Sequence, residues 1–225
     1  VEHDLAANGV PKSKLLTIYK GHDIDWYANL DGTAARHELL SSFQIPADTT
    51  LVGMVANMRS IKGADLLLEA MHKLPQSVHA IFIGEVRAPK IELLASDPKI
   101  RPRVHFTGFR PDAPRLLGGL DINTAPSRRE GLPKSVIEGM AQGIPAVVTT
   151  AGGLPEIVDH GETGYVVPID DLSAFYNGIQ KLIGDRDLRL SMGVAAKRIV
   201  AERFDINATV KNTAALYRRL LTRRS

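Results

Sequence analysis

Residues 126–150 read PSRREGLPKSVIEGMAQGIPAVVTT and indicate, in order, a strand exit, a tight loop, a short helix and a second buried strand. Pro133 stands where the helix would begin, a position at which its missing N–H costs nothing. Gly143 stands just past the expected helix end, where a left-handed cap favours glycine. The stretch therefore places two carboxylates, Glu130 and Glu138, on either side of a helix N-terminus.

The expected helix has one apolar arc that should pack inward, formed by Val136, Ile137, Met140 and Ala141. Glu138 lies outside this arc, on the side that can face a cleft, and Glu130 lies in the loop before the helix. Free N–H groups at a helix start attract phosphate, and carboxylates accept strong hydrogen bonds from sugar hydroxyls. The alternative is an ordinary βαβ unit with two surface glutamates, since most helices carry exposed glutamate.

Composition limits the class of protein. The 225 residues, 44% hydrophobic and 24% charged, suffice for a full core and are ordinary for a soluble globular protein. No apolar run reaches the roughly 18 residues of a membrane helix, and no signal peptide opens the chain. The absence of cysteine excludes disulfides and thiolate chemistry and fits a cytoplasmic protein. The net charge of +3 suits an anionic ligand, a membrane surface or nucleic acid, but aromatic residues are not interleaved with the basic ones, which disfavours nucleic acid.

Short apolar segments alternate with helical ones along most of the chain. The expected strands are residues 51–56, 80–83, 104–107, 121–125, 146–149 and the edge strand 165–168, with a further short strand at 14–19. The expected helices are residues 33–43, 63–74, 90–96, 172–183, 187–204 and 206–221, with a helix tail at 4–8. This alternation predicts an α/β fold with a doubly wound parallel sheet, in which ligands bind beyond the carboxyl ends of the strands. The chain has no Gly-x-Gly-x-x-Gly and no Gly-Lys-Ser/Thr loop, which disfavours a dehydrogenase or a P-loop NTPase.

Cations follow the ends of two expected strands. Arg59 and Lys62 stand at the entrance of a helix after the first strand, where they could hold a diphosphate or be ordinary surface charges. The turn 107–110 follows the third strand, and its Arg110 could equally be a surface arginine.

Two glycines offer a further phosphate contact, because Gly152 and Gly153 follow a strand and open a short helix. The alternative is a tight connection with Glu156 in the first helical turn. No metal site is evident, since the seven histidines show no ligand spacing. The Asp23-x-Asp25 pair is better explained as a turn whose carboxylates bond backbone N–H groups.

The central stretch resembles the Glu-x7-Glu signature of retaining glycosyltransferases with the GT-B fold, in particular glycosyltransferase family four, also called group 1. Glu130 and Glu138 enclose seven residues and are followed by Met-Ala-x-Gly-x-Pro and a valine pair. The resemblance covers roughly residues 15–220. It implies one Rossmann-like half of a GT-B fold that transfers a sugar from a nucleoside-diphosphate donor to an acceptor hydroxyl with retention, without a metal or other cofactor.

The resemblance also implies residue roles in a donor site. Glu138 would accept hydrogen bonds from the ribose hydroxyls. Glu130 would orient the sugar and stabilise developing positive charge, or act as a nucleophile. The backbone that follows it would hold sugar and phosphate, through Gly131, Leu132, Pro133 and Lys134.

Lys62 and Arg59 would neutralise the departing diphosphate, although Asn57 occupies the family's usual arginine position and Arg59 comes two residues later. The turn that contains Phe109 and Arg110 would lie against the base, mostly through backbone groups, so the base is not predicted. Gly152 and Gly153 would play an auxiliary part in the cleft.

The resemblance divides the chain into three parts. Residues 1–20 would be the end of an acceptor domain and the hinge, 21–205 the donor-binding domain, and 206–225 a helix that packs toward the acceptor domain. Because that domain would bind the acceptor glycan, lipid or small molecule, the chain alone is expected to bind nucleotide weakly and transfer little sugar. The arginine-rich end would be a solvated face or a peripheral contact with anionic lipid at the inner face of the membrane. Alternatives are a nucleotide-sugar epimerase of the same architecture, or a non-catalytic nucleotide-binding or interaction module.

Overall fold

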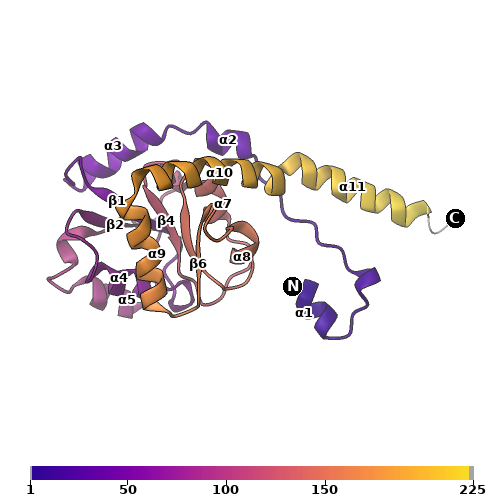
Figure 1. Cartoon of the computed structure of the whole chain (residues 1–225), viewed down its shortest axis with the longest axis horizontal. Coiled ribbons are helices and arrows are strands. Elements are labelled where there is room, and N and C mark those ends of the chain that lie inside the picture. Colours follow the sequence, from indigo (N-terminus) through magenta and orange to yellow (C-terminus); the bar gives the residue numbers. More distant parts are fainter. Residues whose placement is uncertain (1, 223–225) are drawn as a thin grey trace.

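Figure 1 shows the computed structural model of the chain, which describes residues 2–222. Its centre is a sheet of six parallel strands in the order β3-β2-β1-β4-β5-β6. They are β1 (Thr50–Val55), β2 (Val78–Ile83), β3 (Val104–Phe106), β4 (Ile122–Ala125), β5 (Ala146–Thr149) and β6 (Gly164–Val167). The order reverses between β1 and β4, and ligands bind such sheets in the crevice beyond the strand ends at that point. The predicted doubly wound parallel sheet is confirmed.

Helices cover both faces of the sheet, as a buried parallel sheet requires (Figure 1). One face packs against α4 (Ala64–Met71), α5 (Pro89–Ala95) and α9 (Leu172–Gly184). The other packs against α3 (Gly32–Ser42), α6 (Ala113–Leu117), α7 (Lys134–Ala141), α8 (Leu154–Ile157) and α10 (Arg186–Phe204). Phe82 and Phe175 are fully buried in the first layer and Phe204 in the second, each worth about 1.5–3 kcal/mol of burial.

Aspartates begin four of the helices. Asp31, Asp171 and Asp185 each accept a hydrogen bond from the backbone N–H three residues on, at 2.9, 2.9 and 2.8 Å, and start α3, α9 and α10. Asp23 does the same at 3.0 Å and starts α2 (Ile24–Ala28). Such a cap contributes about 1 kcal/mol. The Asp-x-Asp of this segment thus starts a helix through a backbone bond, as the turn explanation predicted.

The first and last described segments of the chain lie on the same side of the molecule (Figure 1). After α1 (Glu2–Ala7) and the 3-10 turn η1 (Lys12–Lys14), an extended segment runs beside the start of α11 (Ile206–Thr222). There Thr209 donates to the carbonyl of Tyr19 at 2.8 Å. The strand expected at 14–19 is wrong, because this segment lies against a helix and not against a sheet edge with which it could pair.

The longer elements agree with the sequence to within about three residues, while two five-residue helices, α2 and α6, were not predicted. Five residues are little more than one turn, too short to show an apolar period. Helix α11 extends beyond the sheet and buries none of its side chains. Over residues 2–222, no helix has both the length and the apolar character needed to cross a bilayer. Arg223 and Arg224 of the basic end lie outside the described residues.

Two histidines lie side by side at the β3 edge of the sheet. Nδ1 of His79 is 2.9 Å from Nε2 of His105, and the ring of Phe43 packs against His105 at 4.8 Å between centroids. Burial, and then the neighbouring His79, lower the pKa of His105 to about 4. Since this folded-state pKa lies below the ordinary 6.5, the neutral ring stabilises the fold. That contribution is fully present above about pH 6.5 and is lost as the pH falls toward 4.

Lowering the pH from about 7 to about 4.5 is therefore expected to remove about 2 kcal/mol of unfolding free energy through His105. Urea unfolding at both pH values measures the loss, which should be smaller by that amount in His105→Gln. The exposed His37 on α3 provides the control, since His37→Gln should keep the pH dependence of the parent chain. An equal loss in the parent and His105→Gln would contradict the assignment.

Candidate functional site

The connection from β1 to α4 lies against the loop that follows β4. Gly63 ends the 3-10 turn η2 (Ser60–Lys62) with a φ of +72°, and a Cβ on it would lie 1.8 Å from the carbonyl oxygen of Pro126. Only glycine permits both this backbone conformation and this contact. The N–H of Arg128 also donates to the carbonyl of Ile61 at 2.8 Å. Two loops far apart in sequence are thereby joined beyond the ends of neighbouring strands.

Lys62 and Glu130 meet at this junction. Nζ of Lys62 lies 2.7 Å from Oε2 and 3.0 Å from Oε1 of Glu130, and Ser127 donates to Oε2 at 3.0 Å. The side chains are 27% and 12% exposed, so the pair is shielded but still open to a ligand from one side. The structure therefore brings together the lysine after the first strand and the first carboxylate of the Glu-x7-Glu motif.

A cavity of about 490 Å³ adjoins this pair at the carboxyl ends of β1 and β4. Its charged lining consists of Arg59, Lys62, Lys134 and Glu130. Its polar and apolar lining includes Asn57, Thr124, Ser135, Leu132 and Pro133. The volume is that of a small-molecule site, and three cations against one carboxylate favour an anionic ligand.

The loop that carries Glu130 is held by the two glycines after β5. Gly152 has a φ of +56°, and a Cβ on it would lie 1.9 Å from the carbonyl oxygen of Glu130. The N–H of Gly153 donates to the carbonyl of Gly131 at 2.8 Å. These N–H and Cα groups thus contact the Glu130 loop. A role as direct phosphate donors stays a prediction for the glycine pair.

A cluster of ion pairs formed by Asp65, Lys90 and Arg128 was not predicted from the sequence. Arg128 donates to both oxygens of Asp65 at 2.9 and 3.0 Å, and Lys90 donates to the same carboxylate at 2.9 Å. Burial raises the pKa of Asp65, but these hydrogen bonds outweigh it and hold the pKa below its usual value. Asp65 stands in the first turn of α4, so this cluster of ion pairs fixes α4 against the loop after β4. The Ser-Arg-Arg run before Glu130 was the feature of the sequence from which these ion pairs could have been predicted.

Glu138 differs from its expected placement. It was expected to face the cleft, but its side chain is only 6% exposed and does not line the cavity. Nζ of Lys134 covers it at 2.9 Å from Oε1. The same Nζ lies 5.7 Å from the centre of the Tyr27 ring. Tyr27 belongs to α2, an unpredicted helix, so its packing on α7 could not be anticipated.

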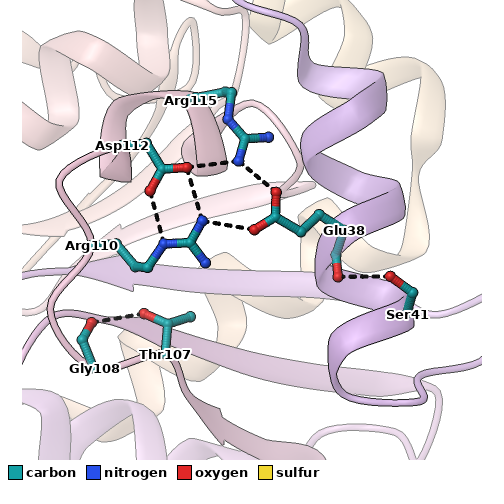
Figure 2. A network of polar contacts seen from close by, with 7 residues as sticks. All are labelled: Glu38, Ser41, Thr107, Gly108, Arg110, Asp112 and Arg115. Atoms are coloured by element: carbon teal, nitrogen blue, oxygen red, sulfur yellow. Dashed lines mark hydrogen bonds and ion pairs between the residues drawn. The ribbon is translucent and has the colours of Figure 1, made fainter.

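Arg110 points toward Glu38 on α3 (Figure 2), and it is not among the residues that line the cavity. It donates to Asp112 at 2.8 Å and to Glu38 at 2.7 Å, and Arg115 donates to the same two carboxylates. Hydrogen bonds to Asp112, and then to Glu38, raise the pKa of Arg110, while the Arg110 guanidinium lowers the pKa of Asp112 to about 2. The network joins α3 to α6. Arg110 therefore takes the position expected of an ordinary surface arginine, the alternative that the sequence left open.

The remaining turn residue, Phe109, is 69% exposed and is also outside the cavity lining. The turn itself is fixed beside the end of β2, because the N–H of Gly84 donates to the carbonyl of Gly108 at 2.9 Å. Among the side chains of residues 5–222, no three from His, Asp or Glu gather as metal ligands would. Whether the reaction requires a metal stays a prediction.

The parallel sheet, with a cationic cavity beside its strand reversal, defines a Rossmann-like domain. The model of the family described as glycosyl transferases group 1 matches residues 49–185, more than half of the chain, so the chain belongs to this family. The family predicted from the Glu-x7-Glu stretch is thereby confirmed.

Curated relatives include two bacterial enzymes. D-inositol 3-phosphate glycosyltransferase of Corynebacterium jeikeium is 34% identical over 191 residues, which cover 78% of this chain and 45% of that protein. N-acetyl-alpha-D-glucosaminyl L-malate synthase of Bacillus anthracis is 27% identical over 210 residues, 92% of this chain and 54% of that protein. The chain thus spans about half the length of these relatives.

Solved structures share the fold. Anabaena HepE in complex with UDP and glucose superposes with a TM-score of 0.86 at 25% identity, over 96% of this chain and 60% of that one. The C-terminal domain of a group 1 glycosyl transferase, LpcC of Francisella tularensis, superposes with a TM-score of 0.72 at 24% identity, over 83% of this chain and all of that one. The described fold therefore matches the C-terminal domain of a group 1 enzyme.

Proposed function

We propose that this chain supplies the donor site of a glycosyltransferase that moves a sugar from a nucleoside diphosphate to an acceptor hydroxyl with retention of configuration. The observation that carries the proposal is the Lys62–Glu130 pair, 2.7 Å apart, in a cationic cavity at the strand reversal. A diphosphate needs cations, and a sugar ring needs hydrogen-bond acceptors beside them. The family membership and the UDP and glucose bound by the similar Anabaena HepE support this choice of ligand.

Each residue has a role in this proposal. Lys62 and Arg59 neutralise the leaving diphosphate, and Glu130 orients the sugar and stabilises developing positive charge. Glu138 accepts hydrogen bonds from the ribose hydroxyls once Lys134 is displaced from it. The backbone of 131–134 and the glycine pair after β5 shape the loop that holds sugar and phosphate. The turn at Phe109 and Arg110 offers its backbone to the base.

The domain arrangement belongs to the same proposal. Residues 1–20 would end an acceptor domain and form the hinge, 21–205 would be the donor domain, and 206–225 would pack on the acceptor domain. The half-length match to the relatives and the unburied helix α11 support this division. We expect the isolated chain to transfer little or no sugar. Contact with an anionic membrane and a cytoplasmic location stay predictions.

Titration of the chain with UDP, GDP and ADP tests the donor site. We expect one of these to bind, and Glu138→Ala to weaken it by roughly ten- to a hundredfold, because charge-assisted hydrogen bonds contribute about 1.5–3 kcal/mol. Glu202→Ala is the matched control, since Glu202 also pairs with a cation four residues away, Arg198, but on α10. Absence of binding by all three nucleotides would favour a non-catalytic interaction module instead.

A further inference from the structure

Both carboxylates of the Glu-x7-Glu motif are paired with a lysine. Lys62 pairs with Glu130 at 2.7 Å, and Lys134 pairs with Glu138 at 2.9 Å. The second pair is unequal, because the Lys134 side chain is 57% exposed whereas that of Glu138 is 6% exposed. A buried carboxylate is therefore covered by the ammonium group of a side chain that is itself more than half exposed.

Lys134 also faces the cavity. It lies in the lining together with Arg59, Lys62 and Glu130, and its Nζ rests 5.7 Å from the Tyr27 ring centre. Hydrogen bonding to Glu138, and then to Tyr27, raises the pKa of Lys134, so the ammonium stays charged at neutral pH. The Lys134 ammonium can consequently pair either with the Glu138 carboxylate or with an anion in the cavity.

Breaking the ion pair between Lys134 and Glu138 costs the lysine less free energy than it costs the glutamate. The largely exposed Lys134 gains little from the pair, because water and side-chain entropy compete with it. A buried carboxylate loses far more when its cation is removed and only the neutral Tyr27 hydroxyl remains beside it. Displacement of Lys134 from Glu138 is therefore cheap only for a ligand that supplies hydroxyl donors to the carboxylate, and it is favourable when the same ligand supplies phosphate for the lysine.

We propose that Lys134 is a positioning residue that satisfies Glu138 in the empty site and transfers its ammonium to the phosphates of a nucleotide when the ribose hydroxyls occupy Glu138. This inference rests on the proposed function. Two parts of one ligand would then act together on the Lys134–Glu138 pair. The ribose of a nucleoside displaces Lys134 but offers the lysine no new partner. A nucleoside diphosphate displaces Lys134 and also supplies a phosphate that the lysine can bind. The site thus discriminates in favour of phosphorylated nucleosides.

The test compares the affinities of UDP and uridine, or of the corresponding pair if GDP or ADP binds better, by NMR titration of the whole chain. In Lys134→Met the ratio of the nucleoside Kd to the diphosphate Kd should fall at least tenfold, with nucleoside binding unchanged or tighter. Lys134→Arg should retain most of the ratio. Lys73→Met, in the exposed turn that follows α4, should retain all of it. Should Lys134→Met fail to fold, Lys134→Gln makes the same comparison.

An equal loss of affinity for nucleoside and diphosphate in the neutral variants would overturn the inference, because it would show that Lys134 only supports Glu138. An unchanged ratio would overturn it as well. Failure of the proposed function looks different, since the parent chain itself would then bind neither ligand.

Discussion

Gly63→Ala is expected to lower the free energy of unfolding by about 2–6 kcal/mol and to separate Lys62 from Glu130. The new Cβ would lie 1.8 Å from the carbonyl oxygen of Pro126, at a backbone φ of +72°. Strain of a non-glycine residue in that region costs about 1–3 kcal/mol, and overpacking a similar amount. Relief requires the η2 turn to move away from the loop after β4, which carries the lysine out of the cavity.

Urea unfolding measures the first effect and nucleotide titration the second. Gly161→Ala provides the matched control, because Gly161 also has a left-handed φ of +82° but a Cβ on it would meet nothing within 4 Å. It should therefore cost only the strain, about 1–2 kcal/mol, and leave nucleotide affinity unchanged. If Gly63→Ala behaves like Gly161→Ala, the two loops are not held against each other as tightly as the structure indicates.

The sheet was predictable from the sequence because each strand is a short buried apolar run bounded by turn residues. The meeting of Lys62 and Glu130 followed from the same rule, since both residues come after strands and parallel strands end on one side. Gly63 was read as the start of a helix, however. Its close approach to Pro126 depends on two backbones that no periodicity connects.

The surroundings of Glu138 and Arg110 were not predictable for a different reason, and the roles of both residues in a donor site stay predictions. Both sets of surroundings depend on partners contributed by residues distant in sequence: Tyr27 packs beside Lys134, and Glu38 captures Arg110. A helical wheel shows which residues share a face but not what covers it. Tyr27 lies on a helix of only five residues, which carries too few positions to display a pattern. The contacts of Lys134 with Glu138 and Tyr27 were therefore not predictable from the sequence, whereas the contact of Lys62 with Glu130 was.

Under the proposed function, Lys62→Met should lower the rate of sugar transfer by about 10²–10³-fold in the full natural protein. Charge builds on the diphosphate as the glycosidic bond breaks, and a cation held in a shielded cleft stabilises it at little reorganisation cost. The pair with Glu130 holds the Lys62 ammonium in place before the donor arrives. Lys62→Arg should retain part of the rate because it keeps the charge.

The measurement is kcat and KM for the donor in each variant. Lys90→Met is the matched control: it also removes a lysine from a carboxylate, Asp65, but outside the cavity lining, and Arg128 remains bound to that carboxylate. A fall in kcat with Lys62→Met alone would mean that the ammonium acts mainly on the transition state. A rise in KM with kcat unchanged would contradict this, because the lysine would then bind the donor and the transition state equally.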